Sequence, residues 1–82
     1  MKPVRYSKQA LRTLTRMPAN DARRIRAKMA QYAEAPQSLA ANVKALKGDT
    51  ALRLRVGDWR IIFDDGVVIA VLRIAPRGSA YE

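Results

Sequence analysis

Apolar and charged positions alternate in the second half of the chain, and this pattern predicts β-strands. The sequence ALRLRV over 51–56 puts an apolar side chain at every second position with arginines between them, which is the period of a strand with one buried face. Gly57-Asp58 is a two-residue sequence of the type that closes a β-hairpin. With a second turn at Asp65-Gly66, we expect an antiparallel three-stranded meander over 51–56, 59–64 and 67–75.

The first half of the chain shows the longer period of amphipathic helices. Ser7 is a good N-cap, and a helix is expected from there to about Arg16. A second helix is expected from Asn20 or Asp21 to about Ala33. The apolar positions expected to face the core are Ala10, Leu11, Leu14, Ala22, Ile25, Met29, Tyr32 and Ala33.

This order of elements predicts an α+β domain of βααβββ type, with two N-terminal helices packed on one face of a mostly antiparallel sheet. A short strand over 2–6 takes a first or edge position, because Pro3 cannot donate to a ladder. Residues 37–50 are expected to be irregular. The 82 residues are expected to form one domain over 1–82, since a typical domain takes about 100–200 residues. A domain this small has no room for a deep substrate cavity, so a site is expected on an open face.

The two tight turns determine which side chains share a face of the meander, because successive side chains alternate between faces. In the register that they set, Arg55 lies opposite Arg60, and Ile62 lies opposite Ile69. The expected core face consists of Leu52, Leu54, Val56, Trp59, Ile61, Phe63, Val68, Ala70, Leu72 and Ile74. The expected outer face consists of Arg53, Arg55, Arg60, Arg73 and Arg77, with Ile62, Ile69 and Val71 beside them.

The arginines of this outer face are a poor choice for stability alone. Like charges directly opposite each other destabilise a sheet, and Arg55 faces Arg60 in the expected register. Phosphate binding at an anion site would offset that cost. In the alternative interpretation, the arginines are solvated or paired with Asp58 and Asp64. The pattern of residues leaves both interpretations open.

The composition narrows the possible chemistry. The chain has 16 lysines and arginines against 7 acidic residues, a net charge of +9, which favours phosphate-rich or acidic partners. It has no cysteine and no histidine, which removes thiolate chemistry and the commonest metal ligand. We therefore expect no metal and no small-molecule cofactor. No apolar run approaches the ~20 residues of a membrane span, and the N-terminus lacks the apolar core of a signal peptide, so a cytoplasmic protein without membrane contact is expected.

Two stretches form motifs: Leu46–Gly48 followed by LRLRVGDWRIIF over 52–63, and VLRIAPRGSAY over 71–81. The first is similar to L-x-G … Y-R-x-R-x-G-D-Y-R-I-I-Y and the second to V-x-x-I-x-H-R-x-x-x-Y. These patterns resemble the RelE/ParE superfamily, the toxins of type II toxin–antitoxin systems, and the resemblance covers nearly the whole chain. One departure is Pro76, which stands where the family often has a histidine before the position of Arg77.

The resemblance implies one of two activities. RelE-like members cleave messenger RNA in the ribosomal decoding site without a metal, whereas ParE-like members poison DNA gyrase and generally lack the basic catalytic set. We expect the first, a ribosome-dependent endoribonuclease whose partners are mRNA, ribosomal RNA and a cognate antitoxin that neutralises it. The alternatives are a gyrase poison without nuclease activity and a non-catalytic RNA-binding module without an antitoxin.

Carried over residue by residue, the resemblance implies a catalytic set of Arg53, Arg55, Arg60, Arg77 and Tyr81. The implied reaction is attack of a 2′-hydroxyl on the adjacent phosphate, which gives a 2′,3′-cyclic phosphate and a 5′-hydroxyl. Arg60 is expected to stabilise the charge on the phosphoryl oxygens, and Arg77 to assist. Tyr81 would have its pKa lowered by the nearby cations, or would stack on a base. Further RNA contacts are expected from Arg73, Arg23, Arg24 and Arg26.

Overall fold

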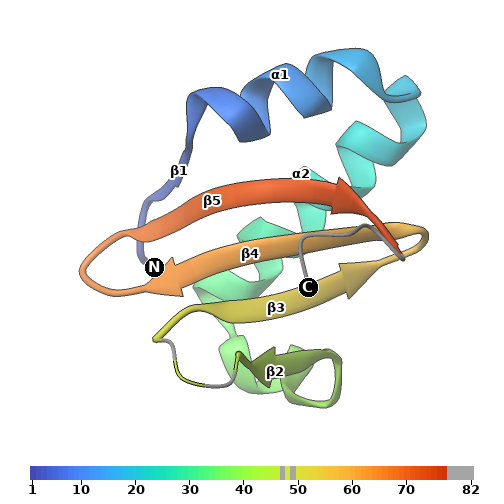
Figure 1. Cartoon of the computed structure of the whole chain (residues 1–82). Coiled ribbons are helices and arrows are strands. Elements are labelled where there is room, and N and C mark those ends of the chain that lie inside the picture. The colour runs from blue at the N-terminus through green and yellow to red at the C-terminus, as the bar shows by residue number, and fades with distance from the viewer. Residues whose placement is uncertain (47, 49, 78–82) are drawn as a thin grey trace.

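The computed structural model describes the whole chain except residues 47, 49 and 78–82. Its helices are α1, α2 and a 3₁₀-helix, and five strands form one sheet (Figure 1). In chain order the elements are β1 (Val4–Tyr6), α1 (Lys8–Arg16), α2 (Ala19–Glu34), the 3₁₀-helix (Pro36–Asn42), β2 (Val43–Ala45), β3 (Leu52–Val56), β4 (Trp59–Asp65) and β5 (Ile69–Pro76). The strand order is β1-β5-β4-β3-β2, with β1 parallel to β5 and the other pairs antiparallel. The expected α+β architecture is confirmed.

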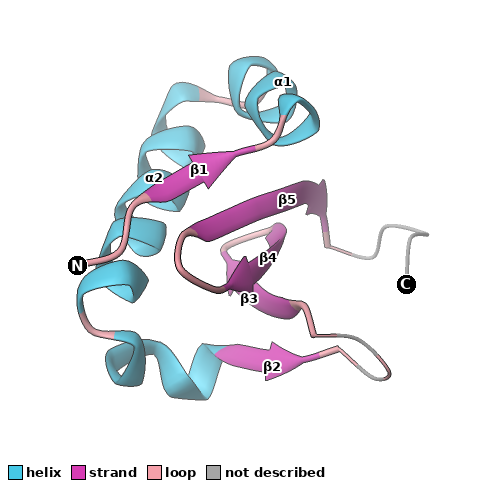
Figure 2. Cartoon of the chain, turned by 90° about the vertical axis from the view of Figure 1, so that its left-hand side faces the viewer, coloured by secondary structure: helices cyan, strands magenta, loops and turns pink. Residues whose placement is uncertain are grey.

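The two long helices cover one face of the sheet, and the other face carries no helix among the described residues (Figure 2). Helix α1 begins where the cap predicts, because the Ser7 hydroxyl accepts a hydrogen bond of 3.0 Å from the amide of Ala10. The apolar stripe of α2 is buried against the sheet, and the rings of Tyr32 and Phe63 meet edge to face at 4.9 Å. Leu11 was expected in the core but is 43% exposed. A small core therefore lies between the helices and one sheet face.

The segment expected to be irregular, 37–50, contains two regular elements. It begins within the 3₁₀-helix and continues into β2, which pairs with β3. Strand β2 has only three residues, too few for a clear period-two signal. The sheet consequently has a fifth strand on the edge beside β3, and that strand brings a further cation, Lys44, next to Arg53.

The β3–β4 hairpin has the expected register. Arg55 pairs with Arg60, and Leu54 pairs with Ile61. The two-residue loop works because Gly57 adopts a positive φ of 58°, which costs glycine little. The alternation of β3 therefore translates directly into one buried and one outward face.

The β4–β5 register differs from the expected one. Strand β4 continues to Asp65, the loop is 66–68, and Ile62 pairs with Arg73 instead of Ile69. An irregularity between Ile62 and Phe63 then changes the pairing by one residue. As a result Ile69 and Val71, expected on the outer face, are buried in the core, whereas Leu72, expected in the core, is 41% exposed.

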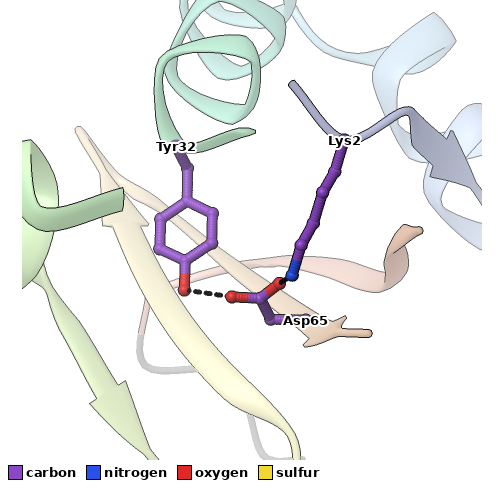
Figure 3. A network of polar contacts seen from close by, with 3 residues as sticks. All are labelled: Lys2, Tyr32 and Asp65. Atoms are coloured by element: carbon purple, nitrogen blue, oxygen red, sulfur yellow. Dashed lines mark hydrogen bonds and ion pairs between the residues drawn. The ribbon is translucent and has the colours of Figure 1, made fainter. Parts of the chain in front are cut away.

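A polar cluster on the helix side accounts for the longer β4. Asp65 accepts a hydrogen bond of 2.9 Å from the hydroxyl of Tyr32, and its other oxygen pairs with Lys2 at 2.5 Å (Figure 3). These contacts hold Asp65 as the last residue of the strand. Gly66 does not have the positive φ that a two-residue turn of type I′ would require. The Asp65-Gly66 sequence therefore does not form the tight turn that was expected.

No helix in the described part of the chain is both long and apolar enough to pass through a membrane.

Candidate nucleic-acid interface

The outer face of the sheet carries a first cross-strand row of side chains that runs from β2 to β5. Lys44 pairs with Arg53, Arg53 with Ile62, and Ile62 with Arg73. Paired strands lie about 4.8 Å apart, so the row places three cations on the same side of the sheet, with an isoleucine in the centre. Ile62 is only 8% exposed, which makes it an apolar floor between the charged groups.

A second row lies two residues further along the strands. Here Arg55 pairs with Arg60, and Arg60 pairs with Ala75. Just past β5, the amide of Arg77 donates a hydrogen bond of 2.7 Å to the carbonyl of Asp58. This bond ties the end of β5 to the β3–β4 turn, so Arg77 is held beside the second row. The structure thus brings the expected arginines 53, 55, 60, 73 and 77 onto one open face, which we call the arginine face together with Lys44.

The arginine face stands on a rigid support. Its central strand, β4, has a hydrogen-bonded neighbour on each side, and the alternate side chains Ile61 and Phe63 are completely buried beneath it. The backbone that carries side chains such as Arg60 therefore does not need to reorganise when a ligand binds. Fixed positive groups of this kind stabilise charge that develops in a transition state.

Asp58 and Asp64, which were considered as partners of the outer-face arginines, form no ion pair with them between described residues. Between residues that the structure describes, the one ion pair is Lys2–Asp65, on the helix side of the sheet. No ion pair joins an arginine of the face to Asp58 or Asp64 within that part of the chain. Pairing with these two carboxylates, one half of the alternative interpretation, is therefore not found among the described residues, and Arg60 and Arg73 each have another interaction.

Where the 3₁₀-helix runs into β2, the arginine face is hollowed. The hollow has a volume of about 200 Å³ and is lined by Ala41, Asn42, Lys44, Arg53 and Arg55. The sequence pattern did not single out Lys44, because its strand was not expected. The alternation of Val43, Lys44 and Ala45 was the available signal, and three residues were too few to use it.

Three of the expected RNA contacts lie elsewhere. Arg23, Arg24 and Arg26 are exposed on α2, which covers the opposite side of the sheet. Arg26 lies over the ring of Tyr6, with 5.0 Å between the guanidinium carbon and the ring centre. Arg24 packs beside the hairpin turn, where a methyl group on Gly57 would come within 3.3 Å of its Nη2. These arginines do not join the arginine face.

The expected catalytic set included one aromatic residue, Tyr81, and the expected core face included Trp59. Tyr81 lies outside the described residues. Trp59, expected in the core, is half-buried against it, and its indole Nε1 donates a hydrogen bond of 3.1 Å to Asp21 at the start of α2. Trp59 thereby links the hairpin that carries Arg60 to the helix layer.

The shifted pKa values belong to the helix side of the sheet and its edge. Burial, together with the hydrogen bond to Asp65 and the charge of that carboxylate, raises the pKa of Tyr32 to about 12. The hydrogen bond from Lys2 lowers the pKa of Asp65. Burial also raises the pKa of Tyr6, against the opposing charge of Arg26. These groups stabilise the fold and take no part in the arginine face.

Comparison with known proteins assigns the fold and the family. The chain matches the family model of the ParE toxin of type II toxin–antitoxin systems over residues 4–81. A search of curated protein sequences returns no match. Among solved structures, the chain is similar to an archaeal RelE–RelB complex from Pyrococcus horikoshii OT3, with 28% identity, a TM-score of 0.81 and coverage of 96% of this chain and 98% of that chain.

Two further structures agree in fold. The isolated RelE toxin of E. coli has a TM-score of 0.78 at 15% identity, over 99% of this chain and 89% of that chain. The RelB–RelE complex of Methanococcus jannaschii has a TM-score of 0.73 at 24% identity, over 94% of both chains. The family resemblance inferred from the motifs is thereby confirmed. Since the family model spans almost the whole chain, the chain belongs to the ParE toxin family of type II toxin–antitoxin systems, within the RelE/ParE superfamily, and has the fold of the RelE toxins.

Proposed function

We propose that this toxin is an endoribonuclease that cuts messenger RNA on the ribosome without a metal ion. The observation that carries the proposal is the arginine face, in which Arg53, Arg55, Arg60, Arg73 and Arg77 lie on one open surface of the sheet. Arginine is always charged and binds phosphate through two parallel hydrogen bonds. A surface of this kind suits a polyanion whose backbone phosphate is the reacting group.

The reaction needs no water and no bound metal. A bond forms between the ribose 2′-oxygen and the adjacent phosphorus, and the bond from phosphorus to the next 5′-oxygen breaks. The 2′-hydroxyl loses its proton, and the leaving 5′-oxygen gains one. Negative charge accumulates on the phosphoryl oxygens in the transition state, and Arg60, on the central strand β4, is the group proposed to stabilise it.

The proton transfers fall to groups other than histidine, since the chain has none. Arginine has a pKa above ~12 and tyrosine about 10, so neither is an efficient base at neutral pH without help. In the proposed mechanism, Tyr81 would serve as the proton carrier, since cations close to a tyrosine favour its phenolate. Arg77 next to the leaving group would stabilise the departing oxygen.

The proposed protein partner is a cognate antitoxin that covers part of the arginine face. The solved relatives from P. horikoshii and M. jannaschii are RelE–RelB complexes of a toxin with its antitoxin. The net charge of +9 favours an acidic partner. The expected result for a toxin–antitoxin complex is protection of the arginine face; a complex that leaves Arg53, Arg55 and Arg60 all open would contradict it.

A second candidate function is poisoning of DNA gyrase, because the matching family model is that of the ParE toxin. The two functions separate cleanly when the 5′ ends of cellular mRNAs are mapped after brief expression. Cuts inside the codons of translated messages, with 5′-hydroxyl ends, support the nuclease. DNA breaks with intact mRNA support the gyrase poison.

Matched variants strengthen this test. Arg60→Ala should abolish the cuts, whereas Arg12→Ala, which removes the same charge from an exposed site on α1, should leave them. Cuts that persist in Arg60→Ala would remove the arginine face as the nuclease site.

A further inference from the structure

The hollow between the 3₁₀-helix and β3 is a candidate subsite of its own. It is lined by Ala41, Asn42, Lys44, Arg53 and Arg55 and has a volume of about 200 Å³. We infer that this hollow binds the backbone phosphate of an RNA nucleotide that flanks the cleaved bond, with Lys44 as a ligand. The inference rests on the proposed function, because it assigns a second phosphate position to the same RNA strand.

Three cations converge on the hollow, and none of the described residues that line it carries a carboxylate. Lys44 and Arg53 are direct cross-strand partners, and Arg55 follows on the same face of β3. Like charges in such positions destabilise a sheet. Within the described part of the chain none of the three forms an ion pair, so their repulsion is not relieved there by an internal anion. A bound phosphate supplies the missing negative charge.

The hollow and Arg60 lie at different positions on the arginine face. Lys44 is on β2 and Arg60 on β4, so two strand spacings separate them, about 10 Å. They also differ by one row along the strands, which adds about 7 Å in the perpendicular direction. The resulting separation is about 12 Å between backbones, and Arg60 is not among the described residues that line the hollow. We therefore assign the hollow and Arg60 to two different phosphates, with Arg53 and Arg55 on β3, the strand between β2 and β4.

The lining favours RNA over an acidic peptide. Asn42 contributes a side-chain amide, which can donate to a phosphate oxygen and accept from a hydroxyl. A ribose beside the bound phosphate presents a 2′-hydroxyl that is both donor and acceptor. A compact ammonium group such as that of Lys44 binds phosphate as a point charge. The small side chain of Ala41 leaves the space into which the phosphate fits.

The test measures binding of the full chain to a single-stranded RNA that carries 2′-deoxyribose at every position where cleavage would occur. For a single-stranded nucleic acid, each phosphate contact that is removed reduces the magnitude of the slope of log K against log salt by about 0.7. Lys44→Gln should therefore reduce the slope by about 0.7. Lys28→Gln removes the same charge from the exposed side of α2 and should leave the slope unchanged.

A second variant separates a shaped site from general positive charge. Ala41→Leu keeps every charge and fills the hollow from an exposed position of the 3₁₀-helix. It should reduce the slope as Lys44→Gln does. An unchanged slope in both Lys44→Gln and Ala41→Leu, or an equal reduction in Lys44→Gln and Lys28→Gln, would overturn the inference. The inference would also be overturned if Lys44→Gln weakened antitoxin binding and left RNA binding unchanged, since the hollow would then be a peptide site.

Cleavage of ribosome-bound mRNA distinguishes this inference from the proposed function. A flanking-phosphate ligand affects substrate binding, so Lys44→Gln should raise KM several-fold and leave kcat within about twofold. Arg60→Ala should lower kcat. If the wild-type chain cuts no mRNA at all, the proposed function fails, and the salt dependence of RNA binding still decides the role of the hollow.

Discussion

Replacing Tyr32 by phenylalanine tests how the helix layer is held to the end of β4. The substitution removes the hydroxyl that donates to Asp65 at 2.9 Å and keeps the ring contact with Phe63. A hydrogen bond to a charged group contributes about 1.5–3 kcal/mol. The side chain of Asp65 is 25% exposed and retains Lys2 as a partner, so water replaces part of the lost bond. We expect the free energy of unfolding to fall by about 1–1.5 kcal/mol at pH 7, at or just below the lower limit of that range.

The pH dependence of this loss has a definite sign. The pKa of Tyr32 is raised from 10.0 to about 12 in the folded state, so its stabilising effect is complete below pH 10 and is lost as the pH rises through 12. The pKa of Asp65 is lowered from 3.8, so its effect is present above that pH and is lost as the pH falls through the lower folded value. Wild type and Tyr32→Phe should therefore differ most between about pH 4 and 10.

Urea unfolding followed by the fluorescence of Trp59, the single tryptophan, measures this difference. The series should run at pH 5, 7, 9 and 11.5. The control is Asp65→Asn, in which Tyr32→Phe should cost less, because the charged acceptor is already gone. Equal stability of wild type and Tyr32→Phe at pH 7, or a difference that persists undiminished at pH 11.5, would refute the argument.

Three further outcomes follow from the site. Arg60→Ala should lower the rate of mRNA cleavage ~10²–10³-fold, while its circular dichroism spectrum shows that the fold is kept. Arg60→Lys should also cleave mRNA more slowly, because a point charge cannot reproduce two parallel hydrogen bonds. Trp59→Ala should cost about 3 kcal/mol in urea unfolding, the low end for a large aromatic residue, because the ring is half-buried; a loss below 1 kcal/mol would contradict its packing role. RNA binding by the chain alone should show a log K against log salt slope of roughly −3 with four or five arginines engaged, and a slope near zero would remove the arginine face as a phosphate site.

The predictability of each strand from sequence depended on how strictly its residue types alternate. In β3, leucines and valine alternate with Arg53 and Arg55, so face, register and hairpin were all predicted correctly. The last strand comes from the run VVIAVLRIA, where nearly every position is apolar and alternation gives no information. Its register was therefore inferred from the Asp65-Gly66 turn alone. That turn did not form, because the contacts of Asp65 with Lys2 and Tyr32 extend β4, and these residues are remote in sequence.

The outward placement of Arg60 and Arg73 was nevertheless predicted correctly in this mispredicted hairpin, and the size of the register error explains why. A shift by one residue moves every side chain of a strand to the other face, but a shift by an even number leaves each face unchanged. Ile62 pairs with Arg73 instead of Ile69, a shift of four, so Arg73 stays on the outer face. Beyond the irregularity the shift is three, since Phe63 pairs with Val71 where the two-residue turn would give Val68. The odd shift moves Ile69 and Val71 into the core. The one-residue irregularity in the β4–β5 ladder is thus what allows β5 to bury its apolar first half and to present Arg73 on the open face in its second half.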